Sequence, residues 1–291
     1  MIEVKKAVIL AAGLATRFLP LSKVVPKELW PVVDKPLVQH LIQEVKLSGI
    51  NQVIFILSPE KKEVLSYFKK EANLEKILKK RKKEGALVEL KNLQDLQDKI
   101  SISSLLQKKP LGDGHAILQA KDMVGNEPFA VLFCDDILDS KVPAILQLLN
   151  VFKTCQRPVI GLSRIPKERI SNYGVVEVEK IAHRLFKVKK IIEKPSPEQA
   201  PSDLAIVGKY ILTPDIFDYL RQKKQNEKGE IVLAEVLDEF LKDGKIVYGY
   251  EMEGEWLECG DKLNWLKSHL LLSLKHPQFG EELKKYLKKI I

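Results

Sequence analysis

Two cationic residues near the start of the chain follow a turn of small residues, in the segment ILAAGLATRFLPLSKVVPKELWPVVDKP. Small residues let backbone amides approach a phosphate closely, and exposed amides at a turn form a nest for an anion. Arg17 and Lys27 would add positive charge beside that nest. The turn alone is a weak signal, because it is neither a P-loop nor a GxGxxG motif. Together with the arginine, the prolines and PKE, it predicts a polyphosphate site.

Two adjacent carboxylates, Asp135 and Asp136, end the hydrophobic run AVLFCDD. Mg²⁺ prefers oxygen ligands and is typically held by one or two carboxylates together with substrate phosphates. Successive side chains of a strand point to opposite faces, so only one of the two is expected to bind a metal. A bare pair of aspartates is also typical of a helix N-cap, and the motif by itself leaves both interpretations open.

The elements that would position these residues alternate between strand and helix. Hydrophobic runs predict strands at 6–10, 51–57 and 130–136, and further strands at 87–90 and 99–103. Apolar spacing and helix signals predict helices at 36–48, 60–84 and 115–124, and a non-helical stretch with Pro20, Pro26 and Pro31 follows the turn AAGLATR. This alternation is typical of a doubly wound, mostly parallel α/β sheet, in which ligands bind at the carboxyl ends of the strands.

The second half is more mixed. Strands are predicted at 173–179, 186–195, 204–213 and 245–253, a helix at 232–243, and a helical C-terminal stretch broken near His276–Pro277. Apolar residues of that stretch (Trp265, Leu266, Leu270, Leu271, Leu274) suit either the core or an interface between subunits. No repeat or low-complexity linker divides the chain, so a single domain over residues 1–291 is expected.

Composition excludes several classes of protein. With 45% hydrophobic and 30% charged residues the chain is an ordinary globular protein, and no apolar run is long enough to span a membrane. Three well-separated cysteines and the absence of a signal peptide predict a reducing, cytoplasmic location. The net charge of +9 comes from lysines interleaved with glutamates, which favours solvated helix faces and small anionic ligands over nucleic acid.

The N-terminal segment resembles the GxGTRxxP…K signature of the sugar-1-phosphate nucleotidylyltransferases, most closely the members that use UTP and glucose 1-phosphate. This resemblance runs in order from about Lys5 to Phe279. It implies a Rossmann-like, glycosyltransferase-A-like fold with a mixed, mostly parallel sheet. The implied nucleotide-binding residues of this segment are Ala12, Gly13, Thr16, Arg17 and Lys27. Alanine 15 replaces the second glycine of the signature, so either the turn tolerates it or the loop is shifted.

A second segment, QKKPLGDGHAIL, resembles the family motif RQxxPLGxGHAV. The resemblance implies that Gln107 and Gly112 recognise the uracil ring, and an amide side chain suits the edge of that base. Asp113 occupies a variable position of the motif. Without the resemblance, the segment would be interpreted as an ordinary helix cap.

The segments NYGVVEVE, IIEKP and LAIVGKY resemble the sugar-binding part of the family. They imply that Gly174 and Glu193 contact glucose, that Lys194 contacts its phosphate, and that Gly208 packs against the sugar. Three approximate parts follow: a nucleotide-binding half (1–140), a smaller β-rich sugar-binding half (141–265) and C-terminal helices (266–291).

Two residues are implied as Mg²⁺ ligands. FCDD resembles the family's GDD, whose first aspartate binds the metal, which assigns Asp135. WLECGDK resembles D-C-G-[ND]-K, and here Glu258 replaces the leading aspartate. Mg²⁺ is strict about geometry, so the longer side chain needs a backbone adjustment or an intervening water. Further departures from the family pattern are Asp203, Val232 and Ala234.

The implied activity is the reaction of UTP with α-D-glucose 1-phosphate to give UDP-glucose and pyrophosphate, with Mg²⁺ as cofactor and Arg17, Lys27, Asp135 and Lys194 as the catalytic residues. The family also implies a homodimer or homotetramer. One alternative is a dTTP-dependent enzyme, because an apolar pocket distinguishes a single methyl group weakly. A second is a protein that binds a nucleotide sugar without turning it over, which Ala15 and Glu258 keep open.

Overall fold

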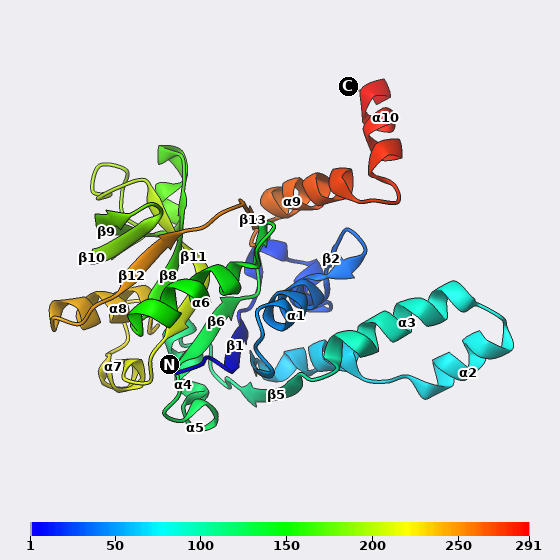
Figure 1. Cartoon of the computed structure of the whole chain (residues 1–291), viewed down its shortest axis with the longest axis horizontal. Coiled ribbons are helices and arrows are strands. Elements are labelled where there is room, and N and C mark those ends of the chain that lie inside the picture. Colours follow the sequence, from blue (N-terminus) through cyan, green and yellow to red (C-terminus); the bar gives the residue numbers. More distant parts are fainter. Residues whose placement is uncertain (1, 291) are drawn as a thin grey trace.

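The structure, a computed structural model, describes residues 2–290 (Figure 1). Its strands are β1 (Lys6–Ala11), β2 (Pro31–Val32), β3 (Lys35–Pro36), β4 (Gln52–Leu57), β5 (Ser101–Leu106), β6 (Phe129–Phe133), β7 (Asp136–Asp139), β8 (Val159–Arg164), β9 (Gly174–Ala182), β10 (Leu185–Glu193), β11 (Leu204–Leu212), β12 (Tyr248–Glu251) and β13 (Glu255–Glu258). Its α-helices are α1 (Leu37–Leu47), α2 (Ala72–Lys80), α3 (Glu84–Gln97), α4 (Asp113–Gln119), α5 (Lys121–Val124), α6 (Ala144–Cys155), α7 (Ile216–Gln222), α8 (Leu233–Lys242), α9 (Lys262–Lys275) and α10 (Gly280–Ile290). Short 3₁₀ segments are η1 (Thr16–Phe18), η2 (Leu21–Lys23), η3 (Lys27–Leu29), η4 (Pro59–Phe68) and η5 (Lys167–Asn172).

A nine-stranded sheet in the order β5-β4-β1-β6-β11-β8-β12-β10-β9 runs through both halves of the chain. The first four strands are parallel, as predicted. From β11 onward the neighbours are antiparallel except for the β8–β12 pair. The mixed α/β sheet is confirmed, with its parallel pairs concentrated in the first half.

Both faces of the sheet are covered, which explains why the strands are hydrophobic without interruption. In β1, Val8 and Leu10 face one core with α4, α7 and α8, whereas Ala7 and Ile9 face the other core with α1 and α6. A smaller cluster joins the two-stranded antiparallel sheet of β7 and β13 to α9. The chain thus forms a three-layer arrangement whose sheet edge is free to carry ligand-binding loops.

Two predicted elements in the first half were wrong. Residues 87–90, expected as a strand, lie inside α3, because a short apolar run fits either element and here the flanking residues are good helix formers. The helix expected over 60–84 is broken into η4 and α2, and Lys82, at φ 54°, closes the turn before α3. The single 3₁₀ turns η2 and η3 lie in the stretch with Pro20, Pro26 and Pro31 that was expected to be non-helical, and η1 lies just before it.

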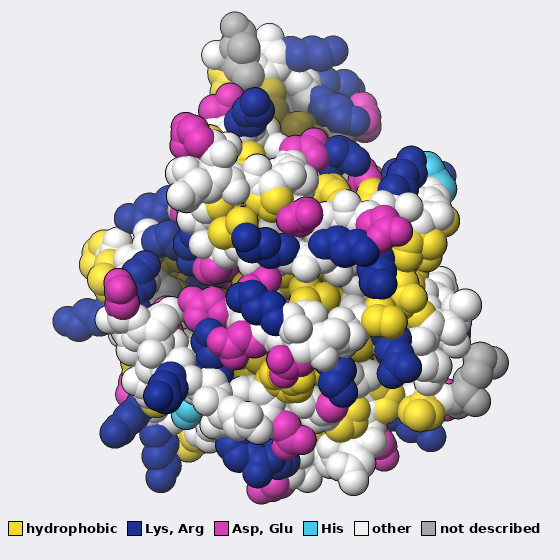
Figure 2. Space-filling view, turned by 90° about the vertical axis from the view of Figure 1, so that its left-hand side faces the viewer, with side chains coloured by type: hydrophobic (Ala, Val, Ile, Leu, Met, Phe, Trp, Pro, Cys, Tyr) yellow, Lys and Arg dark blue, Asp and Glu magenta, His cyan; other side chains and the backbone are white. Residues whose placement is uncertain are grey.

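The α2–α3 hairpin and α10 project from the body of the molecule (Figure 1). On the face shown in Figure 2, lysine and arginine side chains are interspersed with aspartate and glutamate, as expected for solvated surfaces. No helix within residues 2–290 has the length and apolar character to cross a bilayer.

Candidate active site

Two adjoining cavities lie where the loops after β1 and β6 meet residues of β9, β10 and β11. The first, of about 500 Å³, and the second, of about 680 Å³, share Thr16, Asp113, Phe133, Asp135 and Glu230. The candidate residues lining the first cavity are Ala12, Gly13, Thr16, Lys27, Gln107, Gly112 and Asp135. Those lining the second are Thr16, Arg17, Asp135, Gly174, Glu193, Lys194, Gly208 and Glu258. Every candidate site residue named from the sequence therefore lines one of two connected hollows.

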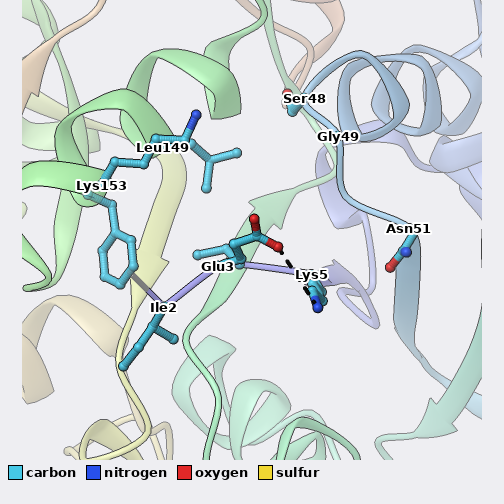
Figure 3. Close-up of a pocket in the computed structure, with 10 residues that line it drawn as sticks. Ile2, Glu3, Lys5, Ser48, Gly49, Asn51, Leu149 and Lys153 are labelled. Atoms are coloured by element: carbon cyan, nitrogen blue, oxygen red, sulfur yellow. Dashed lines mark ion pairs between the residues drawn. The ribbon is translucent and has the colours of Figure 1, made fainter.

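A further hollow of about 580 Å³ lies beside the residues that precede β1 (Figure 3). It is lined by Lys5, the α1–β4 loop around Asn51, and α6 residues such as Lys153. Because this is the amino end of β1, it is opposite to the edge where open α/β sheets bind ligands. None of the candidate residues reaches it.

The turn after β1 keeps its tight shape with alanine in place of glycine. Ala15 has φ 51° and ψ 41°, a left-handed conformation, and its carbonyl oxygen accepts hydrogen bonds from the Phe18 amide at 3.0 Å and the Ser22 hydroxyl at 2.9 Å. The turn thus tolerates the substitution, and the loop keeps the left-handed residue. An L-residue in this region costs about 1–2 kcal/mol.

Replacing Ala15 with glycine should therefore stabilise the fold. Relief of the left-handed strain outweighs the extra freedom of the unfolded chain, so we expect Tm to rise by about 1–3 °C. Thermal unfolding followed by circular dichroism measures this. Ala86→Gly, in the ordinary helix α3, is the matched control and should lower Tm. A lower Tm for Ala15→Gly would contradict the prediction.

Lys27 and Asp135 form the central ion pair of the site. Lys27 Nζ donates to Asp135 Oδ2 at 2.7 Å, and both side chains are largely buried, 12% and 19% exposed. Burial by itself would lower the pKa of Lys27, but the charges of Asp135, Cys134 and Glu28 and the hydrogen bond to Asp135 together outweigh it and raise that pKa above its ordinary value. Burial opposes ionisation of Asp135, and Lys27 reverses this, so the pKa of Asp135 is lowered. Both groups are therefore charged at neutral pH.

The expectation that strand alternation separates Asp135 from Asp136 was wrong in its reason. Cys134 and Asp135 form a turn between β6 and β7, and Asp136 begins β7. The two side chains nevertheless have different partners: Asp136 accepts a hydrogen bond from Trp256 Nε1 at 2.7 Å. Burial, with the adjacent charge of Asp135, raises the pKa of Asp136 to about 7. Asp136 caps no helix.

Gln107 is buried at the wall of the first cavity. Its Nε2 donates to the Gly112 carbonyl at 3.0 Å and lies 2.9 Å from Nδ1 of His115. Gly112 has φ +92°, and a Cβ there would lie 2.4 Å from the Ile231 carbonyl oxygen. Only glycine fits that position, because both the backbone angle and the close contact exclude a side chain. The pair forms a rigid wall with an amide group at its surface.

Asp113 links the two halves of the chain at the junction of the cavities. Its Oδ1 accepts from the Leu233 amide at 2.8 Å and the Gly114 amide at 2.6 Å. It thereby satisfies the first amide of α8, whose own N-cap residue is Val232. Burial raises the pKa of Asp113 to about 6, although the Leu233 amide opposes this shift and the charge of Glu193 adds to it.

The raised pKa makes stability depend on pH. Between the unfolded value near 3.8 and the folded value near 6, the native state holds a proton that the unfolded state releases. The stabilisation is therefore complete below about pH 4 and is lost as pH rises through about 6. The free energy of unfolding falls by an amount on the order of 2–3 kcal/mol over this range. Asp113→Asn keeps the acceptor oxygen and should reduce the fall of Tm between pH 4.5 and 7.5. Identical slopes for the two proteins would contradict this.

Gly174, Glu193 and Lys194 lie together in the second cavity. Gly174 is paired with Glu193 across β9 and β10, and a Cβ on the glycine would lie 3.2 Å from Glu193 Oε2. Lys194 follows directly in a left-handed conformation, φ 48°, and its Nζ lies 3.0 Å from Glu193 Oε1. Its side chain is 55% exposed, so it can move to a ligand. Non-glycine residues held at positive φ are often found at functional sites.

Gly208 allows β11 to approach the end of β6. A Cβ there would lie 2.2 Å from Asp136 Oδ2 and 2.6 Å from Phe133 Cβ. Glycine is needed here because a side chain would collide with Asp136 and Phe133, not because of an unusual backbone angle.

Glu258 is held by a set of donors that the sequence interpretation missed. Its Oε2 accepts from Arg169 Nη2 at 2.6 Å, from Asn264 Nδ2 at 3.0 Å and from the Tyr173 hydroxyl. Tyr173 belongs to the NYGVVEVE segment and Asn264 to the segment WLECGDKLNW that contains Glu258, but Arg169 lies in no motif. Only the folded arrangement of η5, β13 and α9 brings them together.

The two implied metal ligands converge on one point. A Cβ placed on Gly260 would lie 3.0 Å from Asp135 Oδ2 and 3.5 Å from Glu258 Oε1, with Arg17 Nη2 at 3.3 Å. Within residues 2–290, no group of three or more His, Cys, Asp or Glu side chains is arranged to hold a metal. Two carboxylates without further protein ligands fit Mg²⁺, which completes its shell with phosphate and water oxygens.

Comparison with known proteins agrees with this geometry. Residues 6–272 match the family model described as nucleotidyl transferase. A UTP–glucose-1-phosphate uridylyltransferase of Staphylococcus haemolyticus (strain JCSC1435) is 39% identical over 100% of this chain and 99% of its own length. The solved structure of a UTP-bound UGPase from Acinetobacter baumannii has a TM-score of 0.91 and 33% identity, covering 99% of this chain and 100% of that one.

A UDP-glucose pyrophosphorylase solved in complex with UDP-glucose is also similar. It has a TM-score of 0.84 and 32% identity, and it covers 94% of this chain and 100% of that one. The family match and the full-length similarity confirm the resemblance seen in the motifs. The chain belongs to the nucleotidyl transferase family.

Proposed function

We propose that this protein transfers the uridylyl group of UTP to α-D-glucose 1-phosphate, giving UDP-glucose and pyrophosphate. The observation that carries the proposal is the pair of connected cavities that share Thr16 and Asp135. One cavity has the amide of Gln107 and the small-residue turn, as a nucleotide needs. The other has Glu193 and Lys194, as a sugar phosphate needs. Similarity to relatives named for UTP and glucose 1-phosphate supports the same substrates.

The reaction requires alignment and charge stabilisation more than acid–base chemistry. A phosphate oxygen of glucose 1-phosphate attacks the α-phosphorus of UTP, and the bond from that phosphorus to the bridging oxygen of pyrophosphate breaks. The attacking oxygen is already ionised at pH 7, so no protein base is needed. The protein brings two anions together and stabilises the charge at phosphorus through Arg17, Lys27 and Lys194.

The proposal includes Mg²⁺, held by Asp135 and Glu258. When bound, it would neutralise charge on the phosphates and help to orient them. Arg169, Tyr173 and Asn264 hold Glu258 Oε2 and leave Oε1 directed toward the point near Gly260. This second set of contacts offers one way for the longer glutamate to serve where the family has aspartate.

We also propose a cytoplasmic homodimer or homotetramer. All three cysteines are free, as in a reducing compartment. Of the apolar residues on α9, Trp265 packs in the core cluster that joins α9 to the β7–β13 sheet, whereas Leu266 and Leu270 are exposed. Exposed leucines beside a projecting helix support a subunit contact there.

Pyrophosphate release tests the reaction directly. The protein is incubated with glucose 1-phosphate, Mg²⁺ and one nucleoside triphosphate at a time. We expect release with UTP well above that with dTTP. Equal or greater release with dTTP would support the proposed nucleotidyl transfer but would show that UTP is not the preferred nucleotide. No release with any nucleotide, from folded protein that still binds UDP-glucose, would favour a binding protein that has lost the reaction.

A further inference from the structure

A second ion pair lies directly behind the Lys27–Asp135 pair and has no contact with either cavity. Glu28 is fully buried, and its Oε1 accepts from Lys61 Nζ at 2.7 Å. Lys61 is also buried, 9% exposed at its side chain, and lies in η4 after β4. Neither residue lines the two cavities of the candidate active site. The substrates therefore cannot be what this pair contacts.

The position of Glu28 connects it to both members of the catalytic pair. Along the chain it follows Lys27 on the single turn η3, where neighbouring side chains point in different directions. In space its Oε1 lies 3.5 Å from Sγ of Cys134, which directly precedes Asp135. The Glu28 carboxylate thus fixes the residue that directly follows Lys27, and it contacts Cys134, the residue that directly precedes Asp135.

The ion pair of Glu28 and Lys61 is not explained by a gain in the free energy of folding. A buried ion pair is often no more stabilising than well-packed hydrophobic residues of the same volume. Here Glu28 Oε2 has no hydrogen-bond partner among the residues that the structure describes, which adds to the cost of burial. The pair does constrain the position of η3. Glu28 Oε1 can accept hydrogen bonds from Lys61 and Cys134 only when η3 packs against η4 and the end of β6.

We propose that Glu28 and Lys61 are positioning residues that hold the η3 turn so that Lys27 Nζ faces Asp135 and the phosphates. The inference rests on the proposed function, because its effect is on that reaction. Glu28 acts through Lys27 and does not touch substrate. Losing the pair lets η3 shift, and a displacement of about 1 Å at a reacting group lowers turnover about 100-fold.

A double-mutant cycle tests whether Glu28 acts through Lys27. Glu28→Gln alone should lower kcat for UTP and glucose 1-phosphate about 10- to 100-fold. In a Lys27→Ala background the same change should alter kcat by less than about twofold, because no lysine remains to be positioned. Lys223→Met, which removes a largely buried lysine paired with Glu235 and Glu239, is the control and should keep wild-type kcat, because none of these three residues lines either cavity.

Thermal unfolding separates positioning from folding. Lys61→Met leaves a buried carboxylate without its partner and should lower Tm strongly. The double variant Glu28→Gln/Lys61→Met removes both charges, so it should regain most of that Tm while kcat stays low. Recovery of both Tm and kcat in the double variant would overturn the inference. It would also be overturned if Glu28→Gln lowered kcat by the same factor in the Lys27→Ala background as in the wild-type protein. If the wild-type protein releases no pyrophosphate, the proposed function fails and this inference with it.

Discussion

Asp135→Asn should lower kcat by about 10³-fold or more while the protein remains folded, because it removes a carboxylate charge that is proposed to hold Mg²⁺ beside the phosphates. Asp135 faces both cavities, pairs with Lys27 at 2.7 Å and shares the point near Gly260 with Glu258. Asparagine keeps the size and one acceptor oxygen, so Lys27 retains a hydrogen-bond partner. Initial rates of pyrophosphate release at several Mg²⁺ concentrations measure the effect.

Asp139→Asn provides the matched control for this variant. Asp139 lies on β7 four residues later and pairs at the surface with Lys275, so its loss should change neither kcat nor the dependence on Mg²⁺. Circular dichroism should show the same fold for both variants. A kcat for Asp135→Asn within tenfold of wild type would remove Asp135 from the reaction.

Lys194→Ala should lower kcat/KM for glucose 1-phosphate by about 10²–10³-fold, the range found when one charge-stabilising donor is removed. The side chain is more than half exposed and, within residues 2–290, pairs only with the adjacent Glu193, so Tm should change little. KM for UTP should also be nearly unchanged, since Lys194 lines the second cavity and not the first. Initial rates with each substrate varied in turn separate the two effects.

Lys189→Ala is the control, on the strand β10 that directly precedes Lys194. Lys189 pairs with Glu179 at the surface and lines neither cavity, so its removal should leave kcat/KM at the wild-type value. If Lys194→Ala raised KM for UTP as much as KM for glucose 1-phosphate, the assignment of Lys194 to the sugar phosphate would be wrong.

Much of the candidate site could be predicted because its motifs are local. Parallel strands β1 and β6 end at one edge of the sheet, so Arg17 and Asp135 could be expected to meet there without any knowledge of packing. The strands themselves were visible as apolar runs, since both of their faces are covered. The shape of the turn at Ala15 was left open by the sequence, because alanine adopts that angle only when its surroundings hold it.

The contacts behind the site could not be predicted, because they depend on residues brought together only by folding. Glu28 and Lys61 are 33 residues apart, and each would ordinarily be interpreted as a solvated surface charge. Arg169 reaches Glu258 across 89 residues. The strand predicted at 87–90 was wrong for another reason, because an apolar run of four residues is too short to distinguish a strand from a turn of helix.

The antiparallel contact between β6 and β11 has a consequence for how the two substrates meet. Lys209 is paired with Leu132 in this contact, so Gly208, proposed to pack against the sugar, and the turn at Asp135, proposed to bind Mg²⁺, both lie just beyond one hydrogen-bonded register. A continuous sheet does not hinge between adjacent strands. The conformational entropy of the backbone that carries these groups is therefore lost when the chain folds, and only loops and side chains remain to be ordered when the two anions bind.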